Sequence, residues 1–202
     1  MKMMTARALL TAALAIPAIC LAATLFAAPR YLTLCWEAED AQNVSGKAWK
    51  SQKFTDDPSG KVSGKRVLSV PHYTPGEHPP KDEVIYKVKV PQDGIYYLWA
   101  RTYWVNGCGN SFFMQIEGYD SGDWIIGGDG TYNSMHWVCL NDGGNNSGNP
   151  RPLQLKKGTV TFTVGAKESA TKIDQFLLTT DRKLTPANIY KPTADLLAPP
   201  PK

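Results

Sequence analysis

Two glutamates in the first third of the 202-residue chain have a spacing at which their side chains can share one ligand. Glu37 and Glu39 stand two residues apart in the run WEAEDA. In a β-strand, side chains with this spacing project from the same face, roughly 7 Å apart. Two such carboxylates repel each other unless a cation or water lies between them, and calcium prefers several oxygen ligands. The pair therefore predicts a calcium site, with two solvated strand charges as the alternative.

The same carboxylates could instead form the acid–base pair of a glycosidase, whose two groups lie about 5–9 Å apart. A glycosidase normally needs a deep cleft and a larger chain, which disfavours this interpretation. The histidines His72, His78 and His136 show no H-x-H or HExxH spacing and the cysteines no CxxC spacing, so catalytic zinc has no support. No G-x-S-x-G, P-loop or dinucleotide-binding pattern occurs. We therefore predict that the protein is not an enzyme.

The elements that would position these residues are predicted to be β-strands. Apolar and polar residues alternate over residues 83–90, a turn follows at 91–94, and 95–105 form a long aromatic strand. Further strands are expected at residues 32–39, 65–70, 111–116, 136–140, 159–164 and 172–179. Many short strands separated by Gly, Pro, Asn and Asp clusters predict an all-β, antiparallel sandwich or barrel.

A charged start and an apolar run precede the predicted strands. Lys2 and Arg7 accompany a run of apolar residues over 8–28, which is typical of a secretory signal. The run also reaches the ~20 residues that span a bilayer, so a retained membrane anchor is the alternative. Both interpretations place the remaining chain outside the cytoplasm, in the periplasm, at the cell surface or secreted.

The rest of the chain divides into one domain and a tail. Residues 31–181 are assigned to the sandwich and residues 182–202 to a Pro-rich tail, which we expect to be extended and solvated. Without Lys2 and Arg7 the charge is 20 Lys+Arg minus 18 Asp+Glu, or +2. This small, scattered excess does not favour a nucleic acid partner.

Three cysteines remain if Cys20 is removed with the leader. They are Cys35, Cys108 and Cys139. In an oxidising compartment we expect one disulfide and one leftover thiol. Cys108 and Cys139 both lie at the ends of predicted strands and are the favoured pair, while Cys35 would be buried in the first strand.

Four stretches of the sequence, in this order and spacing, carry a family pattern. They are WEAEDA at 36–41, VPQDGIYYLWAR at 90–101, HWVCL at 136–140 and LKKGTVTFTVGAKESATKIDQFLLTTD at 155–181. Together they resemble the galactose-binding-like modules of carbohydrate-binding families 6 and 35. The resemblance implies an antiparallel jelly-roll β-sandwich more strongly than it implies a ligand, because one sandwich hosts many functions.

The same resemblance extends the predicted calcium site. In these modules a structural calcium ties the first strand to the last. The resemblance therefore implies Asp174 as a third carboxylate beside Glu37 and Glu39, with Lys65 as the favoured backbone carbonyl. The metal would stabilise the fold and perform no chemistry.

The resemblance also implies a glycan site on loops at one end of the sandwich, here residues 104–110 and 129–136. Aromatic rings stack on the apolar faces of sugars, and planar polar groups bind their hydroxyls. The predicted ligand-binding residues are Trp104, Asn106, Tyr132, Asn133 and Lys172. Lys172 stands where many of these modules have a ligand-contacting Asn, so it could favour an acidic sugar or mark the loss of a neutral-sugar site.

These observations predict an exported, non-catalytic, calcium-stabilised module that binds a polysaccharide or glycan. Such modules usually accompany a catalytic domain, and none is evident in this sequence. The alternative is a structural accessory subunit of a membrane or envelope protein complex. Residues 8–28 would then be the anchor, the Pro-rich tail a docking strip and the loop aromatics a protein interface.

Overall fold

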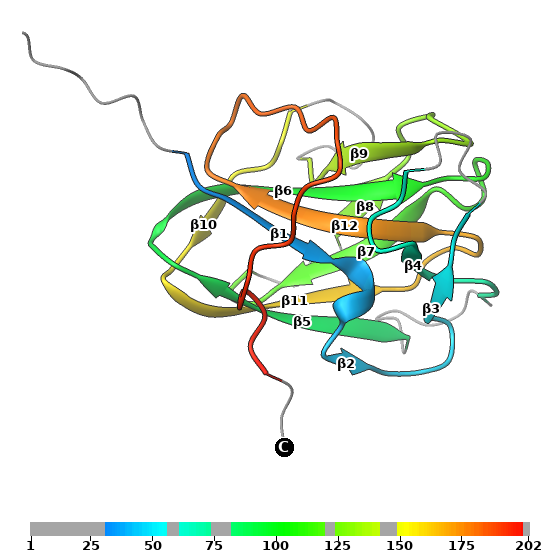
Figure 1. Ribbon diagram of the computed structural model, residues 1–202, viewed down its shortest axis with the longest axis horizontal. Helices are drawn as coiled ribbons and strands as arrows, with labels where there is room; N and C mark the ends of the chain where they lie inside the picture. Colours follow the sequence, from blue (N-terminus) through cyan, green and yellow to red (C-terminus); the bar gives the residue numbers. More distant parts are fainter. Residues whose placement is uncertain (1–30, 56–60, 74–81, 120–123, 142–148, 200–202) are drawn as a thin grey trace, which may run out of the picture. The chain divides into compact units, whose positions relative to one another are not determined.

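The computed structural model describes residues 31–55, 61–73, 82–119, 124–141 and 149–199. The predicted leader over residues 1–28, Cys20 and His78 lie outside these ranges. Within them, two antiparallel sheets pack face to face, and one short 3₁₀ turn interrupts the strands (Figure 1). The predicted all-β antiparallel sandwich is confirmed. Over the same ranges no helix is long and apolar enough to cross a membrane.

The larger sheet is built around two long central strands. Its seven strands are β1 (Thr33–Glu37), β3 (Lys50–Lys53), β4 (Arg66–Ser69), β6 (Gly94–Tyr103), β9 (Met135–Cys139), β10 (Leu153–Leu155) and β12 (Lys172–Thr179). β6 and β12 pair along most of their length. β9 and β10 both pair with the other edge of β6, whereas β1 and β4 both pair with the other edge of β12.

The smaller sheet has five strands in the order β2 (Asn43–Val44), β5 (Glu83–Val90), β11 (Gly158–Gly165), β7 (Ser111–Ile116) and β8 (Trp124–Gly127). The predicted strand over residues 83–90 coincides with β5. The predicted first strand is too long: β1 ends at Glu37, and the 3₁₀ turn η1 (Ala38–Asp40) follows it. Glu39 therefore lies in the turn, not on the strand.

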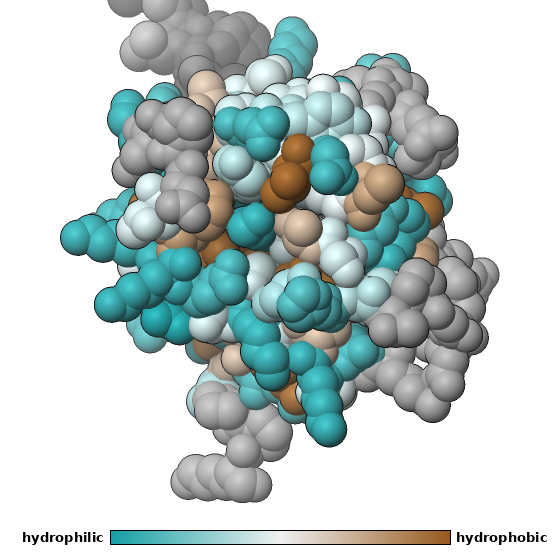
Figure 2. Space-filling view, turned by 90° about the vertical axis from the view of Figure 1, so that its right-hand side faces the viewer, coloured by the Kyte–Doolittle hydropathy of each residue, from teal (hydrophilic) through white to brown (hydrophobic). Residues whose placement is uncertain are grey.

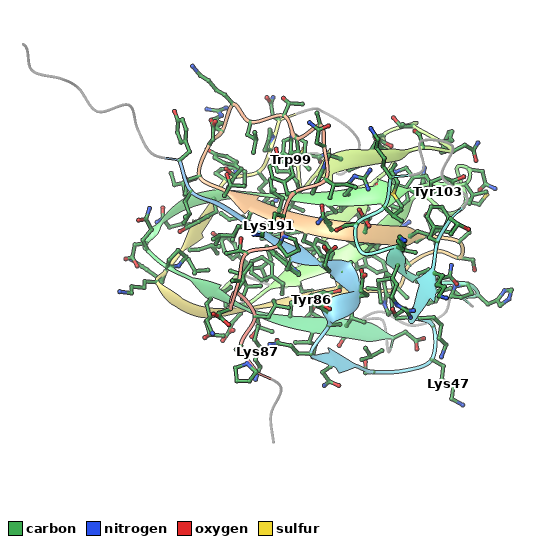
Figure 3. The ribbon with its side chains drawn as sticks, viewed as in Figure 1. Lys47, Tyr86, Lys87, Trp99, Tyr103 and Lys191 are labelled. Atoms are coloured by element: carbon green, nitrogen blue, oxygen red, sulfur yellow. The ribbon has the colours of Figure 1, made fainter. Side chains whose placement is uncertain are left out.

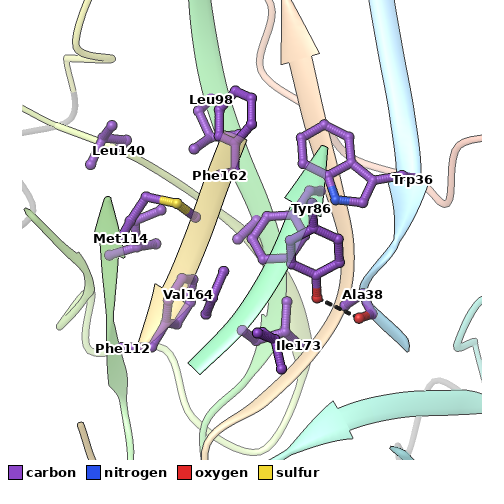
Figure 4. Close-up of a cluster of buried hydrophobic side chains, with 14 of the residues drawn as sticks. Trp36, Ala38, Tyr86, Leu98, Phe112, Met114, Leu140, Phe162, Val164 and Ile173 are labelled. Carbon is purple, nitrogen blue, oxygen red and sulfur yellow. Dashed lines mark hydrogen bonds between the residues drawn. The ribbon is translucent and has the colours of Figure 1, made fainter. Parts of the chain in front are cut away.

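The core lies between the two sheets and is rich in aromatic rings (Figure 4). Trp36 stacks on Phe176, with ring centroids 5.4 Å apart, and Tyr86 packs edge-on against Phe176. The buried Tyr86 hydroxyl donates a hydrogen bond to the carbonyl of Ala38, which joins η1 to β5. Alternation along each strand places these residues inside, since successive side chains point to opposite faces.

An irregularity in β12 changes which residues face the core. The register with β6 shifts between Ile173 and Gln175, as at a β-bulge. Ile173 and Phe176 therefore both belong to the core, although they are three residues apart. Asp174 and Gln175 make their contacts on the outer side of the larger sheet, where they lie next to β1 and β6.

Residues 182–199 pack onto the sandwich, which corrects the prediction of a solvated tail. We call this segment the C-terminal clasp; it crosses from β12 past β1 to β5 (Figure 1, red). Thr193 exchanges two hydrogen bonds with the backbone of Cys35 in β1, at 3.1 and 2.9 Å. Further on, the Lys89 N–H donates to the Leu196 carbonyl at 2.8 Å, and Leu196 is only 4 % exposed within the core. The segment is extended, as its prolines predicted, but it covers the edges of both sheets.

The predicted Cys108–Cys139 disulfide is wrong. In the described ranges Cys35, Cys108 and Cys139 are all free thiols. Cys139 packs in a small cluster with Cys35 and Trp99 on the outer side of the larger sheet, whereas Cys108 is exposed in the loop after β6. Trp99 and Tyr103 mark the course of β6 in Figure 3. Burial raises the pKa of the Cys35 thiol to about 12, which favours the protonated thiol at neutral pH.

Candidate functional site

Glu37 and Glu39 lie together under a turn of the chain at the end of β1. The Oε2 atoms of both side chains are buried and have no hydrogen-bond partner. Oε1 of Glu37 accepts hydrogen bonds from the Ser63 hydroxyl and from the Gln175 amide, the latter at 3.2 Å. Gly64 has a left-handed φ of 56° and lies so close that a Cβ there would be 3.2 Å from Oε1 of Glu39. The site thus offers two unsatisfied carboxylate oxygens.

Burial and mutual repulsion make these carboxylates hard to ionise. Burial, followed by repulsion from Glu37, Asp174 and Asp40, raises the pKa of Glu39 to about 7. Burial also raises the pKa of Glu37, although hydrogen bonds from Ser63 and Gln175 partly offset it. A buried anionic oxygen without a partner is unfavourable, and a cation between the two would relieve both the desolvation and the repulsion.

Asp174 lies in the same cluster, but its oxygens are engaged by other groups. Oδ2 forms a 2.6 Å ion pair with Nη1 of Arg101, and Oδ1 accepts the Ser63 N–H at 2.9 Å. Burial still raises the pKa of Asp174 to about 6, against the lowering effect of Arg101. Asp174 is thus the ion-pair partner of Arg101 in this structure, and its role as a third metal ligand stays a prediction.

Backbone oxygens or water would have to complete any metal shell here. In the described part of the chain, no three His, Cys, Asp or Glu side chains form a group that could hold a metal ion by themselves. The carbonyl of Lys65, the predicted backbone ligand, accepts the Phe54 N–H at 3.3 Å. Lys65 has a φ of 61°, so together with Gly64 it forms a left-handed turn beside Glu39. The side chains that fit a cation are Glu37 and Glu39.

Trp104, which was predicted to stack on sugar, is a core residue. Its side chain is fully buried and contacts the rings of Phe112 and His136. Its indole N–H donates to Oδ1 of Asp129 at 3.1 Å. Trp104 continues the inward alternation of Leu98 and Ala100 beyond the end of β6. This alternation was visible in the sequence and is the signal that should have assigned Trp104 to the core.

Tyr132 is the aromatic residue that the loops do present. Its side chain is 40 % exposed, and its hydroxyl lies 3.5 Å from the Asn110 amide. The neighbouring Asn133 has a left-handed φ of 55° and donates its N–H to the Trp104 carbonyl at 2.8 Å. Oδ1 of Asn106 accepts the Cys108 N–H at 2.9 Å, which shapes the turn of the adjoining loop. The predicted asparagines thus hold the loops in the conformation that presents Tyr132.

Lys172 lies over two aromatic rings on the outer side of the larger sheet. Its Nζ is 5.0 Å from the ring centroid of Tyr103 and 5.3 Å from that of Phe54. Nζ also donates to the Ala170 carbonyl at 3.5 Å. The Tyr103 hydroxyl in turn donates to Oδ1 of Asn133 at 3.5 Å, which joins this cluster to the loop of Tyr132.

Asp129 and His136 support the same loop and were not found from the sequence. Oδ1 of Asp129 accepts N–H groups from Trp104 and Thr131, and Oδ2 lies 2.9 Å from Nε2 of His136. Burial alone would raise the pKa of Asp129, but His136 and Thr131 lower it overall. No sequence spacing relates Asp129 to Trp104, so only the folded chain shows that it fixes the loop beneath Tyr132.

Comparison with known proteins establishes the fold. No protein-family model and no curated protein matches this sequence. The structure is similar to that of a GH26-CBM35 β-(1,4)-mannanase from Podospora anserina, with a TM-score of 0.51 and 14 % identity over 79 % of this chain. This chain spans 29 % of the length of that mannanase. The predicted resemblance is thus confirmed at the level of the fold.

Two isolated carbohydrate-binding modules are matched with lower scores. A family 35 module from Clostridium thermocellum matches with a TM-score of 0.49 and 15 % identity, over 71 % of this chain and 96 % of the module. A CBM6 module of Cellvibrio mixtus lichenase 5A, solved with cellotriose, matches with a TM-score of 0.47 and 16 % identity, over 74 % and 97 %.

Proposed function

We propose that this chain is a non-catalytic carbohydrate-binding module that uses Tyr132 as its stacking platform. The observation that carries the proposal is the presentation of Tyr132: an exposed ring on a loop that Asp129 fixes to the core. The fold shared with a mannanase named for its CBM35 supports the same class of function. The sequence contains no catalytic motif that would point to a competing enzymatic function.

The chemistry around Tyr132 suits a sugar. The ring can stack on the C–H face of a pyranose, and the Asn110 amide beside its hydroxyl can bind a sugar hydroxyl. Figure 2 looks onto the end of the sandwich at which β6 ends, and its coloured surface is mostly hydrophilic with small, separate hydrophobic areas. Such a surface favours a polar ligand held by one ring over a large apolar partner.

A glycan array with the full-length chain tests this function. We expect binding to at least one plant or microbial polysaccharide, and we expect Tyr132→Ala to weaken it about tenfold, which corresponds to about 1.4 kcal/mol. Tyr31→Ala is the matched control. Tyr31 is also an exposed tyrosine, at 54 %, but it lies just before β1 and outside the proposed ligand-binding loops. Absence of all glycan binding, or equal binding by Tyr132→Ala, would exclude the site.

We also propose that calcium binds at Glu37 and Glu39. The support is the pair of buried Oε2 atoms without partners, together with the left-handed turn at Gly64 and Lys65 beside them. When bound, the ion would supply positive charge that stabilises the fold. Thermal unfolding with calcium and with EGTA is the test: we expect a higher midpoint with calcium, and equal midpoints would remove the metal from the proposal.

Export, with or without anchoring through residues 8–28, completes the proposal and rests on the sequence of the leader. The alternative function, an accessory subunit of a membrane or envelope complex, uses the tail as a docking strip beside the anchor and the loop aromatics. Residues 182–199 instead pack on their own sandwich, through Thr193 and Leu196 among others. We therefore favour the carbohydrate-binding function.

A further inference from the structure

One buried amide lies between the proposed cation site and the C-terminal clasp. Gln175 is fully buried beside β1. Its Nε2 lies 3.2 Å from Oε1 of Glu37, 3.1 Å from the Ser63 hydroxyl and 2.8 Å from the carbonyl of Tyr190. Its Oε1 accepts the Tyr190 N–H at 3.1 Å. Gln175 thus binds Tyr190 of the clasp through both ends of its amide, and Glu37 through one.

The Gln175 amide nitrogen has more hydrogen-bond acceptors around it than hydrogens to donate. A glutamine NH₂ group carries two hydrogens, whereas Nε2 of Gln175 has three acceptors within 3.2 Å. One of the three contacts must therefore be weak at any moment. Glu37, Ser63 and Tyr190 therefore compete for two hydrogens, and a charged carboxylate is the strongest acceptor of the three.

A cation at Glu37 changes the outcome of this competition. The cation would neutralise part of the negative charge on Glu37 that attracts the amide. The Gln175 hydrogens would then be shared between Ser63 and Tyr190. The hydrogen bond to Tyr190 would become stronger. Thr193 attaches the clasp to Cys35 independently of Gln175, so the clasp stays docked in both states and only its local stability changes.

We propose that cation binding at Glu37 and Glu39 and docking of the C-terminal clasp are coupled with positive sign through Gln175. This inference rests on the proposed calcium site. Because coupling free energies are reciprocal, weakening the contact between Gln175 and Tyr190 also lowers the affinity for calcium. Gln175 is a positioning residue: it contacts a ligand of the cation and the clasp, not the cation.

Hydrogen exchange on the full-length chain tests the coupling. Exchange of the Tyr190 amide is measured at pH 7.5 with calcium and with EGTA, and calcium binding is measured separately by calorimetry. We expect calcium to slow the exchange of this amide about fivefold or more, at the lower end of typical coupling. In Gln175→Leu we expect faster exchange and no difference between calcium and EGTA.

Thr193→Val is the matched control. It removes the hydroxyl that accepts the Cys35 N–H, so the clasp should exchange faster in both solutions while the effect of calcium persists. Gln175→Met, which also lacks donors, replaces Gln175→Leu if that variant does not fold. If calcium binds but leaves the exchange of Tyr190 unchanged, the coupling is refuted and the metal site stands. If calorimetry shows no calcium binding, both the proposed calcium site and the proposed coupling are refuted.

Discussion

Glu39 shows how one residue in an unfavourable environment makes stability depend on pH. Its pKa in the folded protein is about 7, above the ordinary value of 4.5, because of burial and neighbouring carboxylates. Between these values the folded state binds more protons than the unfolded chain, so stability falls as pH rises. Asp174, with a pKa raised to about 6, acts in the same direction.

In EGTA we therefore expect a higher unfolding midpoint at pH 5.5 than at pH 8. The same comparison with saturating calcium should show a smaller or reversed difference, because the cation stabilises the ionised carboxylates. Thermal melts followed by circular dichroism provide the measurement. A midpoint in EGTA that rises from pH 5.5 to pH 8 would contradict the assignment of buried, partnerless oxygens to Glu37 and Glu39.

Glu39→Gln should separate the charge of this side chain from its shape. We expect the variant to unfold at a higher temperature than the parent in EGTA at pH 8 and to lose most of its response to calcium. Glu117→Gln is the control, because Glu117 is on the surface and its pKa is lowered by Thr161. That variant should keep the full calcium response. Equal calcium responses in the two variants would count against a site at Glu39.

At the scale of strands and loops, the long strand β6 shows what the sequence could predict. Alternation over residues 83–90 predicted β5 correctly, and the same rule applied through Leu98 and Ala100 would have placed Trp104 inside. Trp104 was instead assigned to a ligand site because the family resemblance implied a ligand-binding loop over residues 104–110, although the predicted strand ran through residue 105. The error came from giving the implied loop more weight than the alternation, which continues through residue 104.

Other features of these elements depend on contacts that no local pattern encodes. The shortened β1 leaves Glu39 in η1, yet the fold returns its carboxylate to Glu37 under the turn at Gly64. Arg101 was assigned only to a strand, but it neutralises Asp174 across β6 and β12. The bulge that turns Gln175 outward arises from pairing between distant segments. The acidic residues were therefore predictable, and their partners were not.

Trp104→Ala should behave as a core mutation. Removing a fully buried tryptophan leaves a cavity, for which we expect a loss of about 3–5 kcal/mol of unfolding free energy. Urea denaturation measures this loss. Under conditions where the variant is still folded, its glycan binding should exceed that of Tyr132→Ala. A stability close to that of the parent would show that Trp104 is not packed as described.

Leu196→Ala tests whether the clasp belongs to the core. Leu196 is 4 % exposed, and truncation of such a side chain costs about 2–5 kcal/mol. Ile189→Ala is the matched control from the same segment, because Ile189 is 38 % exposed and its loss should cost about 0.5 kcal/mol or less. Similar urea midpoints for the two variants would mean that the clasp is not part of the cooperative unit.

For the domain as a whole, the clasp changes where the domain ends. Composition placed the boundary at residue 181, because a Pro-rich segment follows. The folded unit instead runs through at least Ala198, whose N–H donates to the Lys87 carbonyl at 2.8 Å. Prolines fix an extended backbone but do not determine whether it is solvated or paired, so composition could not decide this question.

The packing of the C-terminal clasp across both sheet edges has a practical consequence for expression of this protein. Unpaired strand edges are templates for aggregation between molecules, and natural sandwiches shield them. The segment from Thr193 to Ala198 shields backbone groups of Cys35, Lys87 and Lys89. A fragment that stops at residue 181 would leave those groups open and should form insoluble material or oligomers in size-exclusion chromatography, whereas one that ends at residue 199 should elute as a single species.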